Sequence, residues 1–171
     1  MKGFIHVYTG NGKGKTTAAL GLALRAAGAG KEVFIAQFIK GRIYSEIVFI
    51  QKFIPNISIK QYGLRCFIVK NPTLKDIEAA RNGLVEISAV IKSGKYDVVV
   101  LDEANIAVYY NLFSVEELIE TILKKKDGTE IVVTGRYAHE KLIGIADLVT
   151  DMKEVKHYYS RGIQARKGIE Y

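Results

Sequence analysis

A glycine- and lysine-rich stretch, Thr9-Gly10-Asn11-Gly12-Lys13-Gly14-Lys15-Thr16-Thr17, separates a run of β-branched and aromatic residues from an alanine-rich run. This order predicts a strand, a phosphate-binding loop and a helix. Glycines let a backbone turn its N–H groups toward an anion, and the first turn of a helix adds about half a positive charge. We expect Lys15 to neutralise phosphate charge and the Thr16 hydroxyl to bind a magnesium ion. The candidate nucleotide ligands in this stretch are Gly10, Asn11, Gly12, Lys13, Gly14, Lys15, Thr16 and Thr17.

The loop is one residue shorter than the usual nucleotide-binding pattern, in which four residues separate a glycine from Gly-Lys-Ser/Thr. Here three residues lie between Gly10 and Gly14. The shorter loop leaves open which phosphate binds at which position and in which direction the nucleotide lies. A basic glycine-rich turn is the alternative interpretation, and the order of strand, loop and helix argues against it.

The composition is that of one globular domain spanning residues 1–171. Hydrophobic residues make up 49% of the chain, and the two prolines lie in no low-complexity tract that would mark a linker. The single cysteine, Cys66, excludes an internal disulfide and suits a reducing compartment, so we expect a cytoplasmic protein. Since no run approaches the roughly 20 apolar residues of a membrane span, we expect no membrane partner.

The formal net charge of +7 is compatible with a nucleic-acid partner, but the lysines and arginines are spread along the chain rather than gathered in one block. A small polyanionic ligand explains the charge equally well, and nucleic acid is the less favoured partner. The C-terminal segment 155–171 is basic and aromatic. It could stack a purine or bind nucleic acid, or it could be loosely ordered, as chain ends often are.

Hydrophobic runs alternate with amphipathic patterns along the chain, which predicts parallel strands joined by helices. The predicted strands are residues 4–8, 32–38, 57–62, 96–101, 130–134 and 148–152, the last at a sheet edge. The predicted helices are residues 16–27, 45–53, 73–93, 114–123 and 140–146, and residues 64–69 are predicted to form a loop or lid. The fold class is therefore α/β, a three-layer P-loop NTPase-like (RecA-like) domain with a mostly parallel central sheet.

Two acidic residues follow the apolar run 98–101 at the carboxyl end of a predicted strand. This is the Walker B arrangement, in which Asp102 would hold the magnesium shell. Side chains alternate along a strand, so the strand must end or twist for both Asp102 and Glu103 to reach the site. We expect Thr16, Asp102 and Glu103 to form the metal site, with Glu103 also facing the nucleotide.

Further polar residues follow other predicted strands, at the sheet edge where open α/β folds bind ligands. Arg136, just past the fifth strand, is the candidate for a second cation on the polyphosphate. Lys40, Arg42 and Glu46 follow the second strand and are candidate ligand contacts. An ordinary solvated loop is an equally good interpretation of these three residues.

A family resemblance rests on five segments: the loop 8–17, residues 37–41, 100–103 and 134–136, and the tail with residues 155–157 and 168–171. Together they resemble the ATP:corrinoid (cob(I)alamin) adenosyltransferases over nearly the whole chain. The shortened loop and the Gly-Ile-Glu-Tyr ending are specific to that family. The resemblance implies that the 5′-deoxyadenosyl group of ATP moves to the cobalt of a reduced corrinoid, that inorganic triphosphate leaves, and that the enzyme is a homodimer.

The resemblance also implies roles for single residues and partners. Lys15 and Arg136 would be the catalytic residues that stabilise the departing triphosphate. The implied corrinoid contacts are Lys40, Arg42, Glu46 and Phe67. ATP would bind as co-substrate with Mg²⁺ or Mn²⁺, and a reductase would deliver electrons to cobalt. Family members usually have a further segment before the first strand, which here begins at residue 4, so we expect a more open corrinoid site.

The chemistry implied by the resemblance agrees with what the sequence contains. A cobalt(I) centre is itself a strong nucleophile, so the reaction needs no Ser-His-Asp or Cys-His set, and the sequence shows no recognisable one. Two other functions stay open. A kinase or hydrolase could use the same loop, with Glu103 beside the γ-phosphate, and would produce ADP rather than triphosphate. An ATP-dependent nucleic-acid-binding protein of RecA-like fold could use the basic tail, and its binding would be salt-sensitive.

Overall fold

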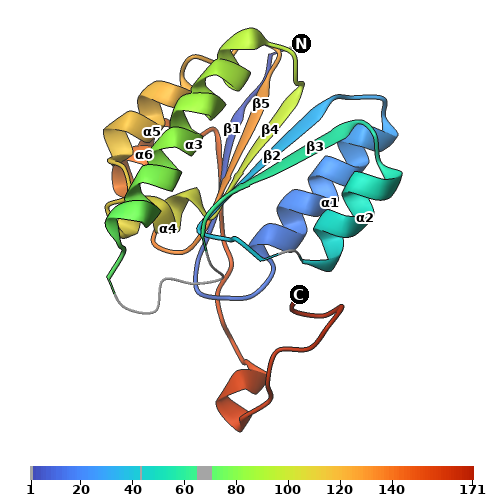
Figure 1. The fold of residues 1–171 in the computed structure, drawn as a ribbon, viewed down its shortest axis with the longest axis vertical. Coiled ribbons are helices and arrows are strands. Elements are labelled where there is room, and N and C mark those ends of the chain that lie inside the picture. The colour runs from blue at the N-terminus through green and yellow to red at the C-terminus, as the bar shows by residue number, and fades with distance from the viewer. Residues whose placement is uncertain (1, 43, 65–70) are drawn as a thin grey trace.

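The fold is built on a six-stranded sheet with strand order β3-β2-β4-β5-β1-β6 in a computed structural model that describes residues 2–42, 44–64 and 71–171. The strands are β1 Ile5–Thr9, β2 Val33–Phe38, β3 Ile57–Tyr62, β4 Val98–Asp102, β5 Glu130–Thr134 and β6 Leu148–Asp151. All the strand pairs in the described part of the chain are parallel. Their carboxyl ends therefore lie together at the lower edge of the sheet in Figure 1.

Helices cover both faces of the sheet and make three layers (Figure 1). One face carries α1 Lys15–Gly28 and α2 Ser45–Phe53; the other carries α3 Leu74–Ser93, α4 Ala104–Tyr109, α5 Val115–Ile122 and α6 Glu140–Ile145. Each face has its own hydrophobic cluster. Ala19 and Ala23 of α1 belong to one, and Ile87 of α3 and Leu118 of α5 belong to the other. The three-layer α/β prediction is confirmed.

The apolar runs become strands that are buried on both faces. All residues of β2 and β4 are buried, as expected for central strands of a parallel sheet covered by helices. By contrast, all residues of β6 are exposed, and β6 lies at the sheet edge as predicted. The central strands therefore provide a rigid base for the loops that follow them.

Local capping signals set the starts of two helices as the sequence predicts. Thr73 and Asp76 form a capping box at α3, in which each side chain accepts from the other residue's backbone N–H. Ser114 and Glu117 form the same arrangement at α5. These bonds satisfy N–H groups that have no partner within the helix.

Two short helices were not predicted: α4, and the 3₁₀ helix η1 Tyr158–Arg161 in the C-terminal segment. Helix α4 starts directly after β4, and its first flanking residue, Glu103, has a φ of 60° and no side-chain capping bond. A turn this tight leaves no loop signal in the sequence. The predicted loop or lid at 64–69, with Cys66 and Phe67, lies outside the described residues except for Leu64.

Among the described residues, no helix is both long and apolar enough to cross a membrane.

Candidate active site

The phosphate loop joins β1 to α1 in a conformation that depends on glycine. Gly10 has a φ of 94°, and a Cβ there would lie 2.2 Å from Asp151 Oδ1. The loop packs against the end of β6, where the Gly12 N–H donates to the Met152 carbonyl over 2.6 Å. Gly14 precedes α1 with a φ of 118°. The prediction that glycines shape this loop is confirmed at these positions.

Lys15 is buried at the start of α1 and points back over the loop. Its Nζ donates to the carbonyl oxygens of Gly10 and Gly12, each over 2.7 Å. Burial, followed by the positive charge of Arg136, lowers the pKa of Lys15. The ammonium thus lies at the mouth of the loop, where a phosphate group would be a stronger acceptor than a carbonyl.

Asp102, the last residue of β4, is buried and accepts hydrogen bonds on both carboxylate oxygens. Oδ1 accepts from the hydroxyls of Thr16 (2.8 Å) and Thr134 (2.7 Å). Oδ2 accepts from Gln37 Nε2 (3.1 Å) and Lys40 Nζ (2.7 Å). Burial alone would raise the pKa of Asp102, but the Lys40 charge and these hydrogen bonds hold it below its usual value. Asp102 is therefore a carboxylate fixed in place by four donors.

Glu103 reaches the same site because the strand ends at Asp102. Its left-handed backbone, with a φ of 60°, turns the chain into α4, and its N–H donates to Thr134 Oγ1 over 3.1 Å. Burial and the adjacent Asp102 charge raise the pKa of Glu103. The expected end of the strand between the two acids is confirmed.

Arg136 follows β5 on an exposed turn that α4 holds in position. Buried Asn105 of α4 donates from Nδ2 to the Gly135 carbonyl over 3.0 Å. The Arg136 charge is close enough to lower the pKa of Lys15 and to counter the rise in the pKa of Glu103. The sequence did not indicate Asn105, because α4 itself was not predicted.

The phosphate loop, Lys15, Glu103 and Arg136 line one cavity of about 790 Å³ at the carboxyl edge of the sheet. A volume of this order suits a nucleotide-sized ligand. Of the predicted ligands, the cavity lining includes Asn11, Gly12, Lys13, Gly14, Lys15, Thr16, Thr17, Lys40, Glu46, Glu103 and Arg136. Ile106 of α4 and Tyr110, the residue after α4, add apolar walls that the sequence did not predict.

The lining lacks three predicted site residues that the structure describes: Gly10, Asp102 and Arg42. Gly10 lies beside the end of β6, where a Cβ on this residue would meet Asp151 and Met152. Asp102 is buried beneath Thr16 and Lys40 instead of lining the cavity. Arg42 is exposed and outside the lining, and its carbonyl accepts from Gln61 Nε2 over 2.8 Å. Phe67 lies outside the described residues. Lys40 lines the cavity, but its ammonium lies against Asp102 and Thr16.

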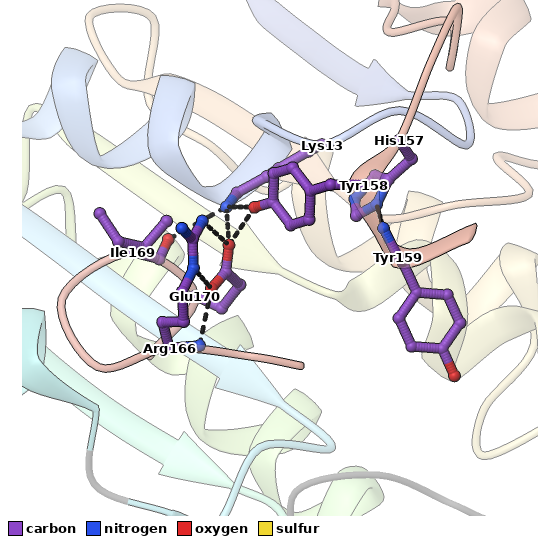
Figure 2. Close-up of polar contacts among 7 residues, drawn as sticks. All are labelled: Lys13, His157, Tyr158, Tyr159, Arg166, Ile169 and Glu170. Atoms are coloured by element: carbon purple, nitrogen blue, oxygen red, sulfur yellow. Dashed lines mark hydrogen bonds and ion pairs between the residues drawn. The ribbon is translucent and has the colours of Figure 1, made fainter. Parts of the chain in front are cut away.

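The C-terminal segment contacts the phosphate loop through Lys13, as Figure 2 shows. Lys13 Nζ donates to Glu170 Oε1 (2.6 Å), the Tyr158 hydroxyl (2.9 Å) and the Ile169 carbonyl (3.1 Å). Glu170 also accepts from the Tyr158 hydroxyl and from the Arg166 N–H (2.7 Å). The hydrogen bond from Lys13, followed by that from Tyr158, lowers the pKa of Glu170 well below its usual range.

This segment forms a wall of the cavity, with His157 and residues 168–171 in the lining. At the chain end, Ser45 Oγ of α2 donates to the Tyr171 carbonyl over 3.3 Å. The segment thus connects the phosphate loop to α2. The sequence left open whether this segment stacks a purine, binds nucleic acid or is loosely ordered, and no sequence signal predicted its contacts with the phosphate loop and α2.

Comparison with known proteins agrees with this geometry. A family model described as ATP:corrinoid adenosyltransferase BtuR/CobO/CobP matches residues 1–171. The corrinoid adenosyltransferase CobA of Salmonella typhimurium is 33% identical over 180 residues, covering 99% of this chain and 86% of its own. The corrinoid adenosyltransferase of Escherichia coli strain K12 is 33% identical, with the same coverage. That of a Sinorhizobium species is 35% identical over 173 residues, covering 99% of this chain and 81% of its own.

Proposed function

Because the chain belongs to the ATP:corrinoid adenosyltransferase family, we propose that the cavity between its phosphate loop and its C-terminal segment binds ATP for that reaction. The protein is an enzyme that transfers the adenosyl group of ATP to a corrinoid in cobalamin biosynthesis or salvage. One observation carries the assignment of the site: Lys15, Glu103 and Arg136 follow three different strands and line one cavity.

In the proposed reaction, cobalt(I) of the reduced corrinoid attacks C5′ of ATP. The electron pair of cobalt forms the cobalt–carbon bond, and the C5′–O bond breaks with its pair going to the departing triphosphate. Cobalt is formally oxidised from +1 to +3, and no proton needs to be removed. The protein holds C5′ in line with cobalt and stabilises the charge on the leaving group. Lys15, Arg136 and the backbone N–H groups of the loop suit the second task.

We propose that Thr16, Asp102 and Glu103 hold Mg²⁺, or Mn²⁺ in its place. A hydroxyl and two carboxylates are hard oxygen ligands, which these ions prefer. The Lys40 ammonium acts as a stand-in cation, 2.7 Å from Asp102 Oδ2 and 3.2 Å from Thr16 Oγ1. These oxygens are therefore arranged to hold a positive charge. When bound, the ion would neutralise phosphate charge.

The remaining proposals follow from the family. The corrinoid would lie on the α2 side of the cavity, where Glu46 contributes to the lining, with Arg42 and Phe67 as further contacts. We also propose that the protein is a homodimer in the cytoplasm and that a reductase supplies electrons to cobalt. The exposed apolar side chains of Phe49 and Phe53 on α2 support a protein contact on this side.

The test is an anaerobic assay with Mg-ATP and chemically reduced cobalamin, in which the visible spectrum and the phosphate products are both followed. We expect a light-sensitive alkylcobalt spectrum and one equivalent of triphosphate. A cavity that serves a kinase or hydrolase would instead release ADP or orthophosphate without a spectral change. That result would contradict the proposed acceptor while leaving ATP binding intact.

A further inference from the structure

Lys40 is held at the candidate metal site by the backbone that follows β2. The strand register pairs Gln37 with Asp102, so the end of β2 lies beside the acid. Ile39 then takes a φ of 65°, which is unfavourable for a β-branched residue, and the Lys40 N–H donates to the Phe38 carbonyl over 2.6 Å. This tight turn directs Lys40 back toward Asp102. Strained backbone of this kind persists only where the surrounding structure enforces it.

The Lys40 side chain fills the space between two proposed metal ligands. Its Nζ lies 2.7 Å from Asp102 Oδ2 and 3.2 Å from Thr16 Oγ1, and the side chain is 12% exposed. Asp102 is 1% exposed, so its charge needs a counterion within the fold. In the protein without nucleotide, Lys40 provides that counterion.

We propose that Lys40 is a built-in cation of the metal site, which a divalent ion must displace in order to bind. This inference rests on the metal site proposed above. A magnesium ion binds its oxygen ligands at about 2.0–2.1 Å. Neither this ion nor manganese in its place can share the Asp102 oxygen and the Thr16 hydroxyl with an ammonium group in the same space. Lys40 therefore lowers the affinity of the nucleotide-free protein for a divalent ion, because the ion must first displace the ammonium group.

A bound nucleotide changes the competition between Lys40 and the metal ion for Asp102. Lys40 also lines the cavity, so after displacement its ammonium can turn to the phosphates of the bound nucleotide. The phosphates then replace Asp102 as its partner, and the metal ion replaces Lys40 at Asp102. Metal bound together with ATP gives Lys40 a phosphate partner, whereas metal bound alone takes Asp102 from Lys40 and leaves Glu46 as the other carboxylate that acts on it outside the metal site. Lys40 thereby makes the site select the metal–nucleotide complex over the free ion.

The test is a titration of the nucleotide-free protein with Mn²⁺, followed by electron paramagnetic resonance. Lys40→Met should bind Mn²⁺ about tenfold more tightly than the wild type, because one close positive charge shifts a neighbouring equilibrium by that order. With ATP present and no corrinoid, the same variant should bind Mn²⁺ more weakly than the wild type, since it has lost a phosphate contact. Adding Asp102→Asn to Lys40→Met should abolish the gain.

Lys60→Met is the matched control, because Lys60 forms an ion pair of the same length, 2.7 Å, with Glu86 on an exposed surface. It should bind Mn²⁺ as the wild type does. Lys40→Gln repeats the test if Lys40→Met does not fold. Mn²⁺ affinity without nucleotide that is unchanged or reduced in the Lys40 variants would overturn the inference, even if the wild type transfers adenosyl groups. If the variants show the predicted Mn²⁺ affinities but the wild type transfers no adenosyl group, only the proposed function is contradicted.

Discussion

Lys15 and Lys40 are two enclosed ammonium groups at the same sheet edge, and their partners give them different roles. Lys15 is bound only to neutral carbonyls of the loop among the contacts that the described residues show. Lys40 is paired with a carboxylate. An incoming phosphate therefore gains Lys15 without breaking an ion pair, whereas Lys40 must first be released from Asp102.

Lys15→Ala should lower kcat/KM for ATP by about 10²–10³-fold, the order found when one preorganised donor to a developing charge is removed. The fold should be kept, because the carbonyls that lose Lys15 lie in a loop beside the cavity. Steady-state kinetics and a thermal melt check both parts. The control is Lys31→Ala, which removes an exposed ammonium 3.7 Å from Asp97 and should leave kcat/KM unchanged. Near-normal turnover in Lys15→Ala would rule out Lys15 as a triphosphate ligand.

Asp102→Asn should destabilise the protein by about 3–5 kcal/mol at neutral pH, because it leaves the Lys40 ammonium enclosed without its counterion. Urea denaturation measures the free energy of unfolding. Glu86→Gln is the control: it breaks the exposed pair with Lys60 and should cost less than about 1 kcal/mol. An equal loss of unfolding free energy in the two variants would contradict the prediction that the enclosed Lys40–Asp102 pair matters more to stability than the exposed Lys60–Glu86 pair.

The destabilisation by Asp102→Asn should also depend on pH. The pKa of Asp102 is lowered by folding, so its charge stabilises the protein fully above its unfolded pKa of about 3.9, and this contribution is lost as the pH falls through the folded pKa. The difference between wild type and Asp102→Asn should be constant from about pH 8 to pH 5 and shrink below about pH 4. A difference that grew on acidification would have the wrong sign.

At the scale of elements, the C-terminal segment acts as part of the nucleotide site. Lys13 belongs to the loop, Glu170 to the chain end and Ser45 to α2, and hydrogen bonds connect all three regions (Figure 2 shows the first two). The short helix α4 has a comparable role on the other side, since Asn105 holds the turn that carries Arg136. Both elements position groups from neighbouring loops.

Glu170→Gln should loosen the C-terminal segment, because it removes the charged acceptor of Lys13. We expect a several-fold rise in KM for ATP with a smaller change in kcat, and faster hydrogen exchange in residues 155–171. Glu116→Gln is the control, since it breaks an exposed ion pair with Lys141 far along the chain from this segment. Unchanged exchange in residues 155–171 would show that Glu170 does not hold the segment.

At the scale of the whole molecule, the site exists because the sheet is parallel. Strands β1, β2, β4 and β5 are neighbours in the sheet and all end at the same edge. Their next residues therefore meet, although they come from positions 10, 39, 103 and 135 of the chain. Alternating apolar and amphipathic patterns were enough to predict this arrangement, and with it the meeting of Thr16, Asp102 and Arg136 at one edge.

Features that depend on neighbouring residues could be predicted from the chain alone: the phosphate loop, the buried strands, the capped helices and the two acids at a strand end. Two ion pairs became visible only in the folded protein: Lys40 pairs with Asp102, 62 residues away, and Glu170 binds Lys13, 157 residues away. Periodicity and capping are local and can be read along the chain, whereas an ion pair between distant segments depends on sheet register and on how a loop turns. The partner of a charged side chain is therefore fixed only when the fold brings the two segments together.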